Sequence, residues 1–303
     1  MKITQRHLSF ITSAVLLAAS LTALPLTAKA GPIAGPLLAS SPGAGVIYEI
    51  APDGTQTIFT QLSQPRGLAF DSFGNLFVAN SDTGLISIIT PAGVLKPFAS
   101  GLSDPVSLVI DSSGNVFVAD IGTNAIYKFT SLGAQSTFAS NLNRPAGLAF
   151  DQVGNLYESE GDGTSILKFT PSGVQSTFAT GVNLPAGLAF DSQGNLYEAD
   201  QGTNSILKFA PNGTSTVFAT FDSSVDFEPI RFAIDSVDNI YVSETHNTGG
   251  STIYKFTPAG IRSTFTIEDN LVSFIAFVPT VQLLNISTRL EVGTVDNVLI
   301  GGF

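Results

Sequence analysis

The stretch Pro185-Ala-Gly-Leu-Ala-Phe-Asp191 decides the fold, because close variants of it occur five times along the chain. The copies end at Asp71, Asp111, Asp151, Asp191 and Asp235, which lie 40, 40, 40 and 44 residues apart. Self-similarity at a period of about 40 residues indicates a repeat architecture in which each unit is one supersecondary structure.

Each repeat unit predicts four short β-strands separated by turn sequences. In the third copy the expected strands cover residues 147–150, 156–159, 166–170 and 175–179. An Asp that caps its own backbone and a Gly that accepts positive φ form the first turn, and Pro-Ser-Gly forms the last. Such a small sheet cannot bury both faces alone, so the units must stack, and a radial stack of four-stranded sheets is a β-propeller.

The two ends of the repeat region predict how the ring closes. Residues 46–50 and 57–60 match the third and fourth strands of a unit, and residues 273–277 match a first strand. We therefore expect an all-β, six-bladed propeller over residues 46–278, with a sixth blade built from N- and C-terminal strands so that no sheet edge stays free.

Three further segments lie outside the predicted propeller. Residues 1–30 are expected to be a signal peptide and residues 31–45 a linker. Residues 279–303 do not follow the repeat and can be read as the start of a further small β module, truncated at Phe303.

The repeated sequences Pro-x-Gly-Leu-Ala-Phe-Asp, Asp-x-x-Gly-Asn-Leu-Tyr and Ala-Asp-x-Gly-Thr-Asn-x-Ile-x-Lys-Phe resemble those of the NHL-repeat propellers. More loosely, they are similar to the senescence-marker/gluconolactonase superfamily. The resemblance covers about residues 46–278 and implies the propeller fold. It does not imply one function, because such propellers host ligands, partners and several chemistries.

The first thirty residues have the parts of a secretory signal peptide. Lys2 and Arg6 precede an apolar run from Phe10 to Leu26, and Ala28-Lys-Ala30 offers a small-x-small cleavage site. The alternative is an uncleaved anchor helix. No later stretch approaches 18 uninterrupted apolar residues, so we expect a bacterial protein exported to the periplasm or the medium, with no membrane span after cleavage.

Composition limits the kinds of catalytic chemistry and the kinds of binding partner that we expect. The chain has no cysteine, which removes thiolate nucleophiles and zinc–thiolate sites. Loss of residues 1–30 removes three basic residues and no acidic one, so the formal charge falls from −11 to −14. Since the Lys and Arg residues do not cluster, we expect no nucleic-acid partner. We expect a monomer that binds a small molecule, a glycan or a protein at one rim.

One position per copy carries a polar side chain where the second strand ends. A ring of carboxylates there would suit a hard cation such as Ca²⁺, and no other cofactor is expected. The alternative is that each side chain caps its own loop. The residues are Asn80, Asp120, Glu160, Asp200 and Glu244.

Glu158 and Glu198 replace a valine of the repeat in the third and fourth copies. Buried carboxylates need partners, so one interpretation is ion pairing with Lys168 and Lys208 on the neighbouring strand. The other is a carboxylate site with raised pKa values, formed with Glu160 and Asp200, for acid–base chemistry or metal binding.

The residue after the repeated Pro is expected to face the channel mouth. In gluconolactonase-like relatives this place supplies Asn and Asp metal ligands, and an early Glu-Gly-Pro supplies a Glu. This chain lacks them at the matching places, so the resemblance does not carry that metal site over. Arg66 and Arg231 instead predict a small anion-binding patch, or ordinary surface salt links. The five residues are Arg66, Val106, Ala146, Ala186 and Ile230.

His246 is the one histidine left after residues 1–30, in a loop longer than its counterparts. It is a candidate lone base or a solvated loop residue. A single histidine excludes a multi-histidine zinc site. The nearby insertion, residues 221–228, lies in the same fifth copy, where binding specificity is expected.

These observations favour a ligand- or partner-binding module over an enzyme. The alternative is a metal-assisted, Ca²⁺-dependent lactone or ester hydrolase, or a lyase, of the gluconolactonase-like kind. Its candidate residues are Glu158, Glu160, Glu198, Asp200 and His246.

Overall fold

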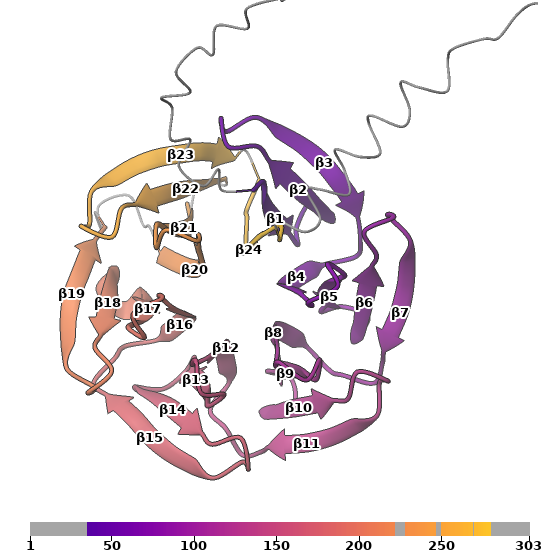
Figure 1. The fold of residues 1–303 in the computed structure, drawn as a ribbon, viewed down its shortest axis with the longest axis horizontal. Coiled ribbons are helices and arrows are strands. Elements are labelled where there is room, and N and C mark those ends of the chain that lie inside the picture. The colour runs from indigo at the N-terminus through magenta and orange to yellow at the C-terminus, as the bar shows by residue number, and fades with distance from the viewer. Residues whose placement is uncertain (1–34, 222–227, 247–249, 269, 280–303) are drawn as a thin grey trace, which may run out of the picture. The chain divides into compact units, whose positions relative to one another are not determined.

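A computed structural model describes residues 35–221, 228–246, 250–268 and 270–279. In these residues 24 strands form six four-stranded antiparallel sheets, arranged as the blades of a propeller (Figure 1). The expected six-bladed fold is therefore confirmed. The expected signal peptide, residues 280–303 of the expected tail and most of the insertion at 221–228 lie outside the described residues.

Five blades follow the five sequence copies and are numbered after them. Each runs from an inner strand, next to the ring axis, to an outer strand (Figure 1). Blade 1 contains β4 (Pro65–Phe70), β5 (Leu76–Asn80), β6 (Leu85–Ile89) and β7 (Leu95–Ala99). Blade 2 contains β8 (Pro105–Ile110), β9 (Val116–Asp120), β10 (Ala125–Phe129) and β11 (Gln135–Ala139). Blade 3 contains β12 (Pro145–Phe150), β13 (Leu156–Glu160), β14 (Ser165–Phe169) and β15 (Gln175–Thr180).

The last two numbered blades carry the irregular loops. Blade 4 contains β16 (Pro185–Phe190), β17 (Leu196–Asp200), β18 (Ser205–Phe209) and β19 (Ser215–Thr220), with a 3₁₀ turn, η1 (Gln201–Thr203), between its middle strands. Blade 5 contains β20 (Glu228–Ile234), β21 (Ile240–Thr245), β22 (Ser251–Phe256) and β23 (Arg262–Glu268). No helix among the described residues is long and apolar enough to cross a membrane.

The closing blade joins the two ends of the propeller. It contains β1 (Leu37–Ser41), β2 (Val46–Ile50), β3 (Gln56–Gln61) and β24 (Phe274–Phe277), in the order β24-β1-β2-β3. The C-terminal strand is innermost, as expected, but the N-terminal part supplies three strands and not two. The expected linker at residues 31–45 therefore contains β1, which the sequence hides because Leu37–Ser41 is not preceded by the Asp-x-x-Gly-Asn turn that leads into a second strand in the other copies.

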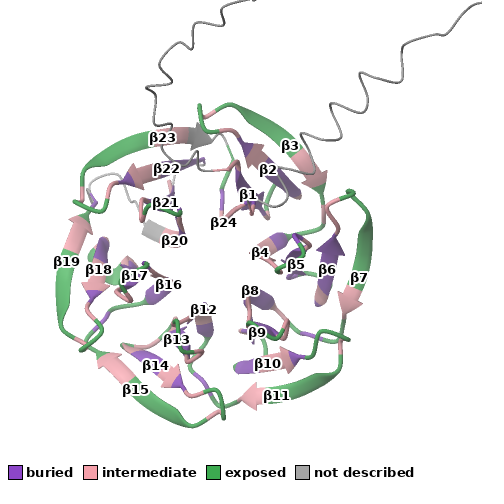
Figure 2. Ribbon diagram, viewed as in Figure 1, coloured by how far each residue is buried: buried purple, intermediate pink, exposed green. Residues whose placement is uncertain are grey.

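The core lies between the blades, so the inner and middle strands carry apolar residues on both faces. Leu156 packs into the cluster shared with blade 2, whereas its neighbour Tyr157 points the other way and packs with blade 4. Burial is greatest in the inner and middle strands and falls toward the outer ones (Figure 2). An edge-to-face ring contact crosses three of the interfaces in the same way, as between Tyr157 and Phe190, whose centroids are 4.9 Å apart.

The glycine of Pro-x-Gly permits the inner strands to approach one another. A Cβ at Gly187 would lie 2.5 Å from the carbonyl oxygen of Ile230 and 2.9 Å from the Cα of Arg231, both in the next blade. A side chain there would therefore push the two blades apart.

Candidate functional site

The polar residues at the ends of the second strands bind their own loops. The buried Asp120 carboxylate accepts hydrogen bonds from the backbone N–H groups of Ser103 at 2.8 Å, Asp104 at 2.9 Å and Gly122 at 3.0 Å. It therefore fixes the chain where it enters β8 and where it leaves β9. These contacts agree with the loop-capping interpretation.

Asp200 does the same in blade 4, where it accepts from the backbone N–H groups of Asn183 and Thr203, both at 2.9 Å. Glu160 accepts from the Ser165 hydroxyl at 2.7 Å. No group of three or more carboxylates or histidines is placed to share a metal ion within the described residues, so a calcium site at this rim stays a prediction.

The predicted ion pairs of Glu158 and Glu198 with Lys168 and Lys208 are wrong. In the register of the sheets Lys168 lies opposite Tyr157, whereas Glu158 lies opposite Leu167. Adjacent residues of a strand point to opposite faces, so the lysine and the glutamate occupy different blade interfaces. The same register separates Lys208 from Glu198.

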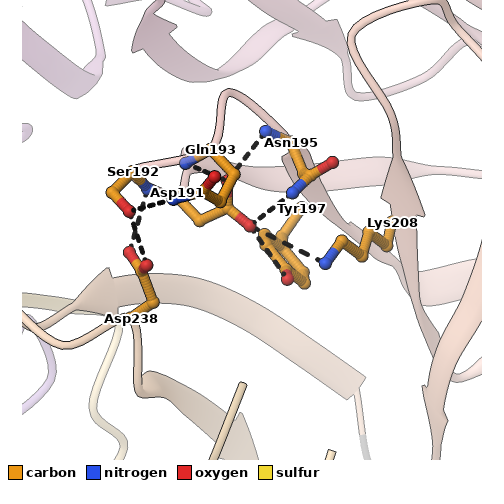
Figure 3. Close-up of polar contacts among 7 residues, drawn as sticks. All are labelled: Asp191, Ser192, Gln193, Asn195, Tyr197, Lys208 and Asp238. Atoms are coloured by element: carbon orange, nitrogen blue, oxygen red, sulfur yellow. Dashed lines mark hydrogen bonds and ion pairs between the residues drawn. The ribbon is translucent and has the colours of Figure 1, made fainter. Parts of the chain in front are cut away.

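The lysines bind the Asp of the first turn, as Figure 3 shows for blade 4. The Lys208 ammonium lies 3.7 Å from an Asp191 oxygen and 5.1 Å from the centre of the Tyr197 ring. Asp191 also accepts from the backbone N–H groups of Gln193 at 3.0 Å and Asn195 at 2.8 Å. This network holds the turn and is structural.

Glu158 and Glu198 are fully buried, and their carboxylate oxygens have no hydrogen-bond partner among the described residues. Loss of hydration disfavours the charged form. Burial, with a smaller contribution from the charge of Asp200, raises the pKa of Glu198 to about 9. Burial, and then the charge of Glu160, raises the pKa of Glu158 well above its usual value. Burial therefore favours the protonated form of both side chains.

Glu244 and His246 lie in blade 5. Burial raises the pKa of Glu244 to about 7, although the charge of Arg262 and the hydroxyl of Tyr254 lower it in part. The Nε2 atom of His246 lies 3.1 Å from the Thr252 hydroxyl oxygen, within hydrogen-bond distance. Neither Glu244 nor His246 lines the channel cavities described next, and the candidate carboxylates of the other blades do not line them either.

A cavity of about 250 Å³ forms the channel mouth, and all five residues after the repeated Pro line it. Arg66 of β4 and Arg231 of β20 share this cavity. These two inner strands flank β24 (Figure 1). Below the mouth, a second cavity of about 230 Å³ is lined by residues of all six inner strands, and Arg231 lines both. The structure thus brings together the two arginines that the sequence singled out.

Arg231 is held across the mouth by neutral groups. Its Nη1 donates to the carbonyl oxygen of Ile230 at 2.9 Å, and its Nη2 donates to that of Ala146 in blade 3 at 3.4 Å. The guanidinium also lies over the Phe274 ring, 4.4 Å from its centre. Burial, and then the charge of Arg66, lowers the pKa of Arg231 to about 9.

Neither arginine forms an ion pair with a carboxylate of the described residues, and the Nε atoms of both are buried without a hydrogen-bond partner there. The signal in the sequence was the departure from the repeat. Arg231 occupies the place that Gly67, Gly147 and Gly187 have in their copies of the repeat. The sequence did not predict the carbonyl contacts or the position above Phe274.

Comparisons with known proteins show a shared fold. No family model matches the chain, and no curated protein matches it significantly. Among solved structures, a nidogen/laminin complex matches with 19% identity and a TM-score of 0.71, over 81% of this chain and 98% of the other. Virginiamycin B lyase from Staphylococcus aureus matches with 18% identity and a TM-score of 0.61, over 77% of this chain and 85% of the other.

A gluconolactonase from Xanthomonas campestris also matches, with 18% identity and a TM-score of 0.59, over 68% of this chain and 78% of the other. These matches confirm a loose similarity to the gluconolactonase-like propellers. At such low sequence identity they show a shared fold and no shared function.

Proposed function

We propose that this chain is an exported propeller that acts as a binding module and takes a small anionic ligand at its channel mouth. The observation that carries the proposal is the pair Arg66 and Arg231, which share one cavity and have no carboxylate counter-ion among the described residues.

Burial chiefly, and then the charge of Arg66, lowers the pKa of Arg231, so two like charges oppose each other in one partly enclosed cavity. A bound anion would replace this repulsion with attraction. Hydrogen bonds between guanidinium and carboxylate or phosphate groups are about twice as strong as neutral ones. The site therefore gains more from an anion than from a neutral or cationic ligand.

Titration calorimetry with acetate, phosphate and sulfate tests the proposal. At least one of these anions is expected to bind to the wild type, more weakly as the salt concentration rises. Arg66→Gln and Arg231→Gln should each weaken binding at least tenfold. Lys96→Gln on the exposed strand β7 removes the same charge away from the mouth and should leave binding unchanged. Equal loss in all three variants would assign the effect to net charge and overturn the site.

Export is the second part of the proposal and rests on residues 1–30. N-terminal sequencing of protein recovered outside the cytoplasm should begin at Gly31. A mature N-terminus at Met1 would contradict it.

A metal-assisted hydrolase or lyase is the second candidate. It is supported by the raised pKa values of Glu158 and Glu198, because a carboxyl group whose protonated form is favoured can act as an acid. Calcium calorimetry with Glu158→Gln and Glu198→Gln, followed by lactone and ester assays, separates it from the binding module. Binding lost in both variants, together with turnover, would favour the enzyme.

A further inference from the structure

We propose that the ligand of the mouth is a small organic carboxylate with an apolar body, its carboxylate between Arg66 and Arg231 and its body on Val106, Ala186 and Ile230. This inference rests on the proposed anion-binding function. It adds the chemical class of the ligand.

The charged end follows from the geometry of Arg231. Two of its N–H groups are used by the carbonyl oxygens of Ile230 and Ala146, and the ring of Phe274 supports its plane. The guanidinium is thereby held in place before a ligand arrives, which reduces the entropy lost on binding. Because its Nε atom and that of Arg66 are both buried, the carboxylate is expected to contact the Nη ends of the two guanidinium groups. A carboxylate, with two oxygens in one plane, matches the parallel N–H groups of a guanidinium.

The apolar end follows from one part of the mouth, whose remaining lining includes the polar side chains of Arg144 and Gln201. Four of the five residues after the repeated Pro are apolar, and Ile121 extends this surface at the end of blade 2. They are Val106, Ala146, Ala186 and Ile230. An inorganic anion would place part of its hydration shell against these side chains and gain nothing from them. A hydrocarbon group removes its own surface and theirs from water.

The size of the ligand follows from the cavity. Its volume of about 250 Å³ lies just below the roughly 300–1,000 Å³ of ordinary small-molecule sites. Arg231 lies where the mouth meets the lower channel, since it lines both cavities. A short-chain or single-ring carboxylate fits this space better than a long fatty acid.

The experiment is a calorimetric series on the purified protein with acetate, butanoate, hexanoate, hexan-1-ol and sulfate. Affinity is expected to rise from acetate to hexanoate by up to about fourfold per methylene group. Hexan-1-ol should bind at least tenfold more weakly than hexanoate, because it lacks the charge. Sulfate should bind more weakly than hexanoate.

Two kinds of variant separate the two ends of the ligand. Arg66→Gln and Arg231→Gln should weaken every carboxylate by a similar factor. Ile230→Thr keeps a β-branched residue but makes the wall polar, so it should weaken hexanoate binding more than acetate binding and reduce the gain from acetate to hexanoate. Circular dichroism confirms that each variant is folded. If Arg231→Gln unfolds the protein, Arg66→Gln carries the comparison.

The outcomes distinguish a failure of the carboxylate inference from a failure of the proposed anion-binding function. Affinity independent of chain length, or sulfate bound more tightly than hexanoate, overturns the carboxylate class and leaves an anion site. No binding of any anion overturns both. Tight binding of hexan-1-ol would show a purely apolar site and also overturn both.

Discussion

Replacing Glu198 by Val, the residue of Val78, Val118 and Val242 at the same repeat position, should make the protein more stable and change how its stability depends on pH. The native protein keeps Glu198 protonated up to a pKa of about 9, whereas the ordinary pKa of this group is 4.5. Between these values the native state holds one proton more than the unfolded state. Raising the pH therefore favours unfolding.

The size of the effect follows from that one proton. The free energy of unfolding should fall by about 1.4 kcal/mol per pH unit through Glu198, or about 4 kcal/mol between pH 5 and pH 8. Glu158 and Glu244, whose pKa values are also raised, act in the same direction. Glu198→Val should remove the contribution of Glu198 and flatten the profile by that slope.

Urea denaturation followed by circular dichroism at pH 5, 6, 7 and 8 measures both profiles. Glu198→Gln is the matched control, since it also removes the titrating group but keeps a buried polar side chain. It should flatten the profile equally and be less stable than Glu198→Val by about 1–3 kcal/mol. A wild-type profile that rises from pH 5 to pH 8, or equal slopes in wild type and both variants, would refute the reasoning.

Three further substitutions test the packing and the loops. Gly187→Ala should lower the thermal midpoint by several degrees, because its Cβ meets the next blade, whereas Gly43→Ala, with open space around it, should not; equal midpoints would contradict the close approach. Phe277→Ala should cost about 3–5 kcal/mol in urea denaturation by removing the ring contact that closes the propeller, while Phe73→Ala, 80% exposed, should cost less than about 0.5 kcal/mol. Asp120→Ala should cost about 2–4 kcal/mol by leaving three backbone N–H groups without their acceptor, and an unchanged denaturation midpoint would show that water replaces it.

The fold could be predicted because five copies of one sequence agree. Strands β12 to β15 lie within two residues of the segments expected in the third copy. Strand β1 of the closing blade was not predicted because Leu37–Ser41 stands alone, without the turn that identifies a second strand in the other blades. A repeat signal averages over copies and is silent where a copy departs from it.

The candidate site was predicted less completely, since its contacts join distant parts of the chain. The repeat placed Arg66 and Arg231 near the channel, but not the contact of Arg231 with Ala146, 85 residues away. The lysine partners were assigned by proximity between neighbouring strands. Only the register of the two strands, in which Lys168 pairs with Tyr157, places Lys168 and Glu158 on opposite faces.

The pairing of Leu37–Ser41 with Phe274–Phe277 also fixes the order of events when the chain is made. Strand β24, the innermost strand of the closing blade, is the last of the described strands in the chain. Five blades can therefore form while the ring is still an open arc with an apolar face at each end. Until that strand emerges, the two ends can meet other proteins or another copy of the same arc. Pairing of the four residues of β24 thus determines when a newly synthesised chain no longer exposes apolar blade faces to other proteins.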